Sequence, residues 1–187
     1  DLFQTHGWSL NRYKEFLEPL NDEPWAQYFS KSLDESMRDE NGKFYAMPVD
    51  AAIAGIPYNV NVLKSAGVNV EEINTWDDFA GACEKIKSSG KICVASSAKT
   101  NEYAGNIADW LLASSYNEKE QEQLQSGEAV RTGYTKAMET VDSWRESGFI
   151  NKDYSSATGD DIAKMLADGE AAFTFKQNVI ITTAEKR

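Results

Sequence analysis

The stretch Asn41-Gly-Lys-Phe-Tyr-Ala-Met-Pro-Val-Asp50 decides how this chain is organised, together with the apolar run Ala51-Ala-Ile-Ala-Gly-Ile-Pro-Tyr-Asn59 that follows it. Asn-Gly predicts a turn, the residues after it predict a short strand, and Pro48 predicts an elbow before a second strand. This order is typical of a backbone that leaves one packed sheet and enters another. Because a crossing between two lobes borders a cleft, we expect the elbow to bear on function as well as on fold.

Length and composition limit the classes of protein to consider. At 187 residues the chain can hold one domain, or one domain and a fragment of a second. Its 19 basic and 30 acidic residues give a net charge of -11. Nucleic-acid binding needs clustered basic residues, so this charge argues against it and favours a simple role in solubility. The longest apolar runs are too short to span a membrane.

The cysteines and the single histidine argue against a metal site or a cofactor. Cys83 and Cys93 do not have the spacing of zinc ligands, and His6 is the only histidine. The two cysteines could form a disulfide if the chain is exported, or they could be two small buried thiols. We favour buried thiols, because each cysteine lies within an apolar pattern.

Both ends of the sequence suggest a longer protein. The chain begins at Asp1 without an initiating Met or the pattern of a signal peptide. It ends at Arg187, shortly after the predicted opening of a helix. We therefore expect any signal peptide to lie upstream.

Beyond the elbow, regularly spaced helix-capping residues and glycine stops predict alternating helices and strands. Thr75-Trp-Asp-Asp78 has the arrangement of a capping box, and the helix after it carries a core stripe up to Gly90. Ile92–Ala95 and Ala171–Phe175 have the composition of buried strands. Further helices are predicted at 60–66, 104–113, 118–125, 133–146 and 160–167. Before the elbow, Ser9 is a plausible N-cap for a helix over Leu10–Leu17. The fold class is therefore α/β.

Five short motifs resemble one known family in their order and spacing. They are Gly42-Lys-Phe-Tyr-Ala-Met-Pro48, Tyr58-Asn59, Thr75-Trp-Asp-Asp-Phe79, Gly148-Phe-Ile-Asn151 and Ala167-Asp-Gly-Glu-Ala-Ala-Phe173. The resemblance covers nearly the whole chain in order. The five resemble motifs of the extracellular solute-binding proteins that deliver sugars to ABC transporters, the group similar to maltose-binding protein.

The resemblance implies a fold of the periplasmic-binding-protein type, in which two α/β lobes close on a ligand about a hinge. Residues 1–50 would be the end of the first lobe and the approach to the hinge, and 51–187 would be an incomplete second lobe. The implied function is non-catalytic binding of a mono- or oligosaccharide. The implied partners are that sugar and the membrane permease subunits of an ABC importer. The implied location is extracytoplasmic, either periplasmic or as a cell-surface lipoprotein.

Candidate ligand-binding residues lie on the loops that would face such a cleft. Trp8 follows a predicted strand end and could stack on a sugar face, or it could be a packing residue. Asp50 at the elbow could bind hydroxyl groups, or it could stabilise the turn. Tyr103 lies where the family often has an aromatic residue facing the ligand, or it could be the first core residue of the next helix. His6 is a weaker candidate.

The segment after the second predicted strand supplies the remaining candidates, Lys176, Gln177 and Asn178. Here the family commonly has Asn-Gly-x-Trp, whereas this chain has Lys176-Gln-Asn-Val179 and no tryptophan. One expected stacking surface is therefore missing, which leaves the class of sugar open. Three other tryptophans lie within apolar helical stripes and are predicted to be core residues: Trp76, Trp110 and Trp144.

Two alternatives to a sugar-binding protein remain. A carbohydrate-active enzyme could use scattered carboxylates. The acidic pairs Asp77-Asp78 and Asp160-Asp161, however, both fall at predicted helix starts, where negative charges interact favourably with the helix dipole. No nucleophile elbow or phosphate-binding loop is present, and we predict no catalytic residues. The other alternative is an interaction or structural module without a small ligand.

Overall fold

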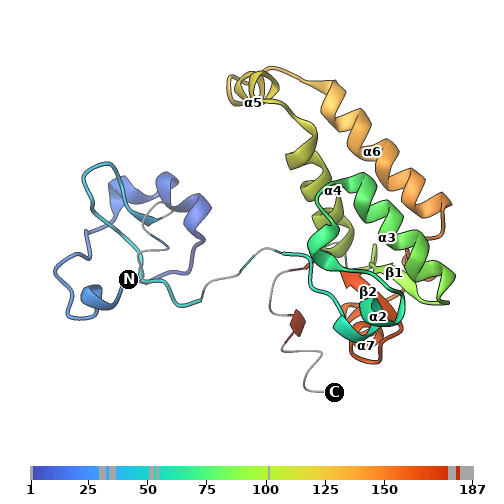
Figure 1. Cartoon of the computed structure of the whole chain (residues 1–187). Coiled ribbons are helices and arrows are strands. Elements are labelled where there is room, and N and C mark those ends of the chain that lie inside the picture. The colour runs from blue at the N-terminus through green and yellow to red at the C-terminus, as the bar shows by residue number, and fades with distance from the viewer. Residues whose placement is uncertain are drawn as a thin grey trace. The chain divides into compact units, whose positions relative to one another are not determined.

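The computed structural model describes residues 2–29, 33, 37–50, 53, 55–100, 102–176 and 180–181, except for the side chains of Trp8 and Asn11. The chain divides into two compact units, Asp1–Ala51 and Ala52–Arg187 (Figure 1). The assignment of residues 1–50 and 51–187 to the two lobes of a binding protein stays a prediction.

The first unit contains short 3-10 helices rather than the α-helix expected near its start. They are η1 (Gly7–Arg12), η2 (Lys14–Phe16) and η3 (Ala26–Tyr28). The Tyr13 amide donates to the Leu10 carbonyl oxygen at 2.9 Å, a bond between residues three apart instead of four. This tighter winding suits short connecting pieces, because its hydrogen bonds are less well aligned.

Phe44 forms the centre of a small aromatic core in the first unit. It is 1% exposed, and its ring centroid lies 4.6 Å from that of Phe29 and 5.8 Å from that of Trp25. The Arg38 guanidinium lies over both phenylalanine rings, 4.9 Å from the centroid of Phe44. Arg38 and Phe44 also form an isolated antiparallel β-bridge. This bridge is what the described structure shows of the strand predicted after the Asn41-Gly42 turn.

The Asn41-Gly42 turn before Phe44 is held by one carboxylate. Asp39 accepts hydrogen bonds from the backbone amides of Asn41 and Lys43, both at 2.9 Å. The bond from Lys43 is the largest of the causes that lower the pKa of Asp39. Gly42 has φ +74°, a left-handed conformation that favours glycine. The predicted turn is therefore confirmed.

The second unit is built on two parallel strands, β1 (Ile92–Ala95) and β2 (Ala171–Thr174). In their register Val94 pairs with Phe173. Single bridges extend the sheet on both sides, antiparallel from Tyr58 to Phe173 and parallel from Ile150 to Val94. Both strands were expected from the sequence, whereas the described residues of the second strand predicted before Asn59 show one pairing, the bridge at Tyr58.

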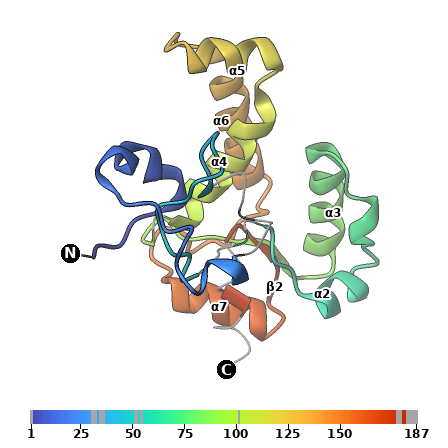
Figure 2. The same cartoon turned by 90° about the vertical axis from the view of Figure 1, so that its left-hand side faces the viewer.

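The helices of the second unit complete the α/β fold. They are α2 (Val60–Ser65), η5 (Val70–Glu72), α3 (Trp76–Ser88), α4 (Glu102–Ser115), α5 (Glu118–Gln125), α6 (Arg131–Glu146) and α7 (Gly159–Ala167). Helix α2 contacts β2 and α3 packs against β1, while α7 contacts both strands and α4 packs along α6. Figure 2 shows α3 and α7 on opposite sides of β2.

The start of α3 is capped as the sequence predicts. The Thr75 hydroxyl accepts from the Asp78 amide at 3.1 Å, and the Asp78 carboxylate accepts from the Thr75 amide at 3.0 Å. Asn59 caps α2 and also donates from Nδ2 to the Leu166 carbonyl oxygen at 2.8 Å. Asn59 thereby ties the start of the second unit to the end of α7.

The preference for two buried thiols was wrong, because Cys83 and Cys93 form a disulfide. Both residues are fully buried, as expected. Helix α3 reverses at Gly90 into β1, and this turn brings the core face of the helix onto the strand. The Cα atoms of the two cysteines are then 5.0 Å apart, within reach of a disulfide.

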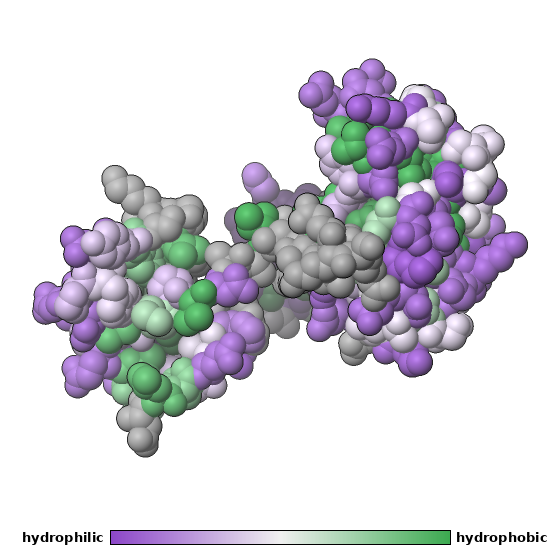
Figure 3. Space-filling model, turned by 90° about the horizontal axis from the view of Figure 1, so that it is seen from below, coloured by the Kyte–Doolittle hydropathy of each residue, from purple (hydrophilic) through white to green (hydrophobic). Residues whose placement is uncertain are grey.

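The two units differ in surface character. On the face seen in Figure 3, hydrophilic side chains cover most of the second unit, whereas hydrophobic side chains gather in several places on the first. The exposed large apolar residues of the first unit are Leu2, Phe3, Tyr13, Phe16, Tyr28, Met47 and Val49. The first unit therefore leaves much of its apolar surface outside its small core.

The close contact of Gly133 with Tyr116 gives a stability prediction for α6. A Cβ atom at Gly133 would lie 2.5 Å from Cε1 of the Tyr116 ring. We expect Gly133→Ala to lower the free energy of unfolding by about 1–3 kcal/mol, as overpacking does. Calorimetry of the full-length protein measures the change.

Gly105→Ala is the matched control, because Gly105 lies within α4 and a Cβ atom there would meet no neighbouring atom within 4 Å. At this position alanine is expected to raise stability by roughly 0.5–1 kcal/mol through its higher helix propensity. Equal effects of the two substitutions would contradict the contact between Gly133 and Tyr116.

Candidate functional site

The carboxyl ends of β1 and β2 are the place to look for a site, since open parallel sheets bind ligands beyond these ends. Strand β1 continues into Ser96 and Ser97, and β2 continues into Phe175 and Lys176. Two of the six predicted ligand-binding residues, Tyr103 and Lys176, meet at this edge.

A buried polar network fixes the loop after β1. The Ser96 amide donates to Oδ1 of Asn151 at 2.7 Å, and Nδ2 of Asn151 donates to Asp153 at 2.8 Å. The Ser97 hydroxyl donates to the Ala157 carbonyl oxygen at 2.6 Å and accepts from the Thr100 amide at 2.7 Å. Because these buried groups are paired, the loop leads to α4 in a defined conformation.

Tyr103 is packed beneath this edge rather than exposed on it. It is 4% exposed and lies in a cluster of apolar residues from β1, β2 and α7. Its hydroxyl donates to the Gly159 carbonyl oxygen at 3.4 Å. Burial raises the pKa of Tyr103, and the charge of Asp160 raises it further. The structure thus favours the core alternative for Tyr103.

Lys176 lies directly against Tyr103. Its Nζ is 5.4 Å from the centroid of the Tyr103 ring, a cation–π distance. The same Nζ forms an ion pair with the Glu102 carboxylate. Burial lowers the pKa of the Lys176 ammonium, since the charged form loses part of its hydration.

Two polar residues of α4 complete the cluster, and sequence reasoning missed both. Glu102 is the partner of Lys176, and Asn106 donates from Nδ2 to the Phe175 carbonyl oxygen at 3.0 Å. They lie four residues apart and therefore on one face of the helix. That spacing, just after a loop that leaves a strand, is the signal that could have found them.

The remaining predicted site residues lie in the first unit or outside the described residues. Asp50 is exposed in the first unit, as is the weaker candidate His6 at the start of η1. Trp8 lies in η1, but its side chain is outside the described structure, as are the whole residues Gln177 and Asn178. The ligand-binding roles of all five stay predictions.

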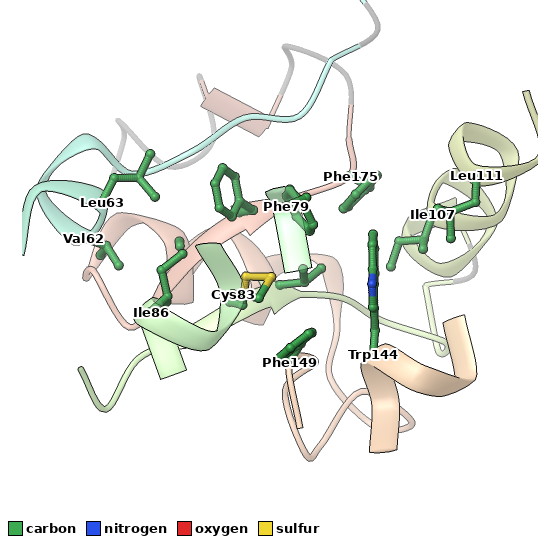
Figure 4. Close-up of a cluster of buried hydrophobic side chains, with 14 of the residues drawn as sticks. Val62, Leu63, Phe79, Cys83, Ile86, Ile107, Leu111, Trp144, Phe149 and Phe175 are labelled. Atoms are coloured by element: carbon green, nitrogen blue, oxygen red, sulfur yellow. A yellow bond between two sulfur atoms is a disulfide. The ribbon is translucent and has the colours of Figure 1, made fainter. Parts of the chain in front are cut away.

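The three tryptophans assigned to the core agree with the structure. Trp144 is 2% exposed, and Trp76 and Trp110 pack partly buried against the same cluster. Figure 4 shows Trp144 among Phe79, Phe175 and residues of α4. This cluster lies under the end of β2, so it supports the backbone that carries Lys176.

The described residues contain neither a grouped metal site nor a membrane-spanning helix. No three His, Cys, Asp or Glu side chains among them are grouped as a metal site would need. Within the same part of the chain, no helix combines the length and the apolar character needed to cross a bilayer.

Comparison with known proteins gives matches over nearly the whole chain. The profile of the bacterial extracellular solute-binding proteins matches residues 3–187. The melibiose/raffinose/stachyose-binding protein MelE of Bacillus subtilis is 30% identical over 183 residues, which are 94% of this chain and 42% of MelE.

Two of the similar solved structures illustrate the fold that they share with this chain. A Bacillus licheniformis sugar transporter protein in complex with stachyose has a TM-score of 0.80 at 30% identity, covering 99% of this chain and 50% of that one. A binding protein of Bacillus subtilis in an open conformation has a TM-score of 0.81 at 27% identity, covering 100% of this chain and 48% of that one. The chain thus spans about half the length of the proteins it matches. The expected α/β fold of the periplasmic-binding-protein type is confirmed.

Proposed function

Because this chain belongs to the bacterial extracellular solute-binding proteins, we propose that the full-length protein binds a sugar without altering it and delivers it to an ABC importer. The observation that carries the proposal is the 30% identity to MelE, which extends over 94% of the chain. In such a mechanism, ligand binding raises the population of a closed state, and this state docks on the permease subunits.

The ligand class that we propose is the oligosaccharide series of melibiose, raffinose and stachyose. MelE is named for binding these three sugars, and the Bacillus licheniformis protein was solved with stachyose. Both proteins are 30% identical to this chain. This narrows the mono- or oligosaccharide expected from the sequence to a series of neutral oligosaccharides.

The proposed ligand-binding residues are those predicted from the sequence, with the role of Tyr103 changed. Tyr103 would act by supporting Lys176, since its ring is buried beneath the ammonium group. The other residues proposed for the ligand site are Trp8, Asp50, Lys176, Gln177 and Asn178. We also propose that residues 1–50 end the first lobe and that 51–187 form most of the second.

The family supports an extracytoplasmic location and the partners that we propose. Its proteins are extracellular, and a disulfide such as Cys83–Cys93 persists in an oxidising compartment. The finer proposal is a periplasmic or lipid-anchored protein that hands its sugar to membrane permease subunits.

Titration calorimetry of the full-length protein tests the proposal. Melibiose, raffinose and stachyose are the ligands, and an amino acid and a polyol panel are the controls. We expect saturable binding of at least one of the three sugars. Binding of an amino acid or a polyol, with no heat from any sugar, would overturn the sugar proposal.

The enzyme alternative is tested on the same samples. After prolonged incubation with the protein, the sugar that binds should be recovered unchanged. Sustained product formation that a single carboxylate-to-amide substitution abolishes would show an enzyme instead of a receptor.

A further inference from the structure

We propose that Lys176 is a positioning residue of the sugar site, which holds the Glu102 carboxylate in one orientation to accept hydrogen bonds from ligand hydroxyl groups. The inference rests on the proposed sugar binding and deepens it. It starts from the ion pair between these two side chains at the carboxyl ends of β1 and β2.

The two partners of this ion pair differ in exposure. The Lys176 side chain is 13% exposed, whereas that of Glu102 is 62% exposed. The ammonium group is therefore the covered part of the pair and the carboxylate is the part that reaches solvent. An incoming molecule would meet Glu102 first and Lys176 only behind it.

Two contacts fix Lys176, one at its side chain and one at the backbone of the residue before it. The Tyr103 ring lies under the ammonium group, and Tyr103 is itself fixed by burial and by its contact with Gly159. The hydrogen bond from Asn106 to the Phe175 carbonyl oxygen ties the preceding residue to α4. Since α4 also carries Glu102, the helix and the end of β2 keep the two charges together.

The chemistry of the pair suits a neutral sugar. A carboxylate only accepts hydrogen bonds and an ammonium group only donates them, whereas a sugar hydroxyl group does both. An exposed glutamate that is already oriented loses less conformational freedom on binding, which favours affinity. Because the two charges balance each other, the carboxylate can accept hydrogen bonds from a ligand that carries no charge of its own.

Calorimetric titration of the full-length protein with raffinose and stachyose tests the inference. We expect Lys176→Met to weaken binding about two- to tenfold, the factor that corresponds to the cost of ordering one flexible side chain. Glu102→Gln should weaken binding at least as much. The double variant should bind no more weakly than Glu102→Gln alone, because Lys176 acts through Glu102.

Two further variants separate positioning from general structure. Lys176→Arg keeps a cation against Glu102 and should restore most of the affinity. Lys164→Met removes a solvent-exposed ion pair with Asp168, 2.7 Å away at the end of α7, and should leave affinity unchanged. Thermal unfolding of each variant shows whether it is folded. If Lys176→Met does not fold, the affinities of Lys176→Arg and Glu102→Gln are compared with that of the wild-type protein instead.

The outcomes distinguish this inference from the function on which it rests. If the wild-type protein binds neither sugar, the proposed ligand class and this inference both fail. If the wild-type protein binds and Lys176→Met binds equally well, only the positioning role is overturned. Additive losses in the double variant would also overturn it, since Lys176 would then act independently of Glu102.

Discussion

Replacing both cysteines, Cys83→Ala together with Cys93→Ala, will lower the free energy of unfolding by about 3 kcal/mol. The disulfide joins residues ten apart in sequence, and closing this loop restricts the unfolded chain. For a protein of this size the loss corresponds to a fall in Tm of roughly 5–10 °C. Scanning calorimetry of the full-length protein measures it in the transition that includes the second unit.

A reductant provides the control for this double substitution. Dithiothreitol should lower the Tm of the wild-type protein toward that of the double variant and leave the variant unchanged. Both sulfur atoms are fully buried, so we expect reduction to require partial unfolding. Two titratable thiols in the unreduced, denatured wild-type protein would contradict the disulfide.

The disulfide shows what an apolar pattern alone does not reveal. The burial of Cys83 and Cys93 was predicted from the apolar residues around them, and it is confirmed. Their pairing depends on the angle at which α3 turns into β1, and no periodicity specifies that angle. Burial is a property of one face of an element, whereas a disulfide requires two faces to meet.

The second unit was largely predictable because its signals are local. The capping box at Thr75, the glycine stop at Gly90 and the apolar strand Ile92–Ala95 each determine structure within a few residues, and all three are present. In the first unit, Ser9 as an N-cap predicted a helix at 10–17, where the structure has two short 3-10 helices. A short helix has little cooperative stability of its own, so its surroundings decide its form.

The candidate site was predictable only in part for a related reason. Lys176 follows the predicted strand Ala171–Phe175, and its position at the end of β2 could be inferred. Its partner Glu102 lies 74 positions away in the sequence, and only the register of β1 and β2 brings them together. For Tyr103 the sequence leaves a ligand-facing and a core role open, and its burial favours the core.

Phe79→Ala will cause the largest loss of stability among the single substitutions considered, about 3–5 kcal/mol, as expected for a large core residue. Phe79 is 2% exposed, and its ring centroid lies 5.0 Å from those of Trp144 and Phe173 and 6.0 Å from that of Phe175. One side chain thus joins α3, α6 and the end of β2 (Figure 4). Denaturant unfolding of the full-length protein measures the change.

Tyr134→Ala is the matched aromatic control, since Tyr134 on α6 is 55% exposed. Its replacement should change the free energy of unfolding by less than about 0.5 kcal/mol. If Phe79→Ala were no more destabilising than this control, the aromatic cluster would not be the core of the second unit. Because Phe175 belongs to that cluster and directly precedes Lys176, such a result would also remove the support that we infer for the ammonium group.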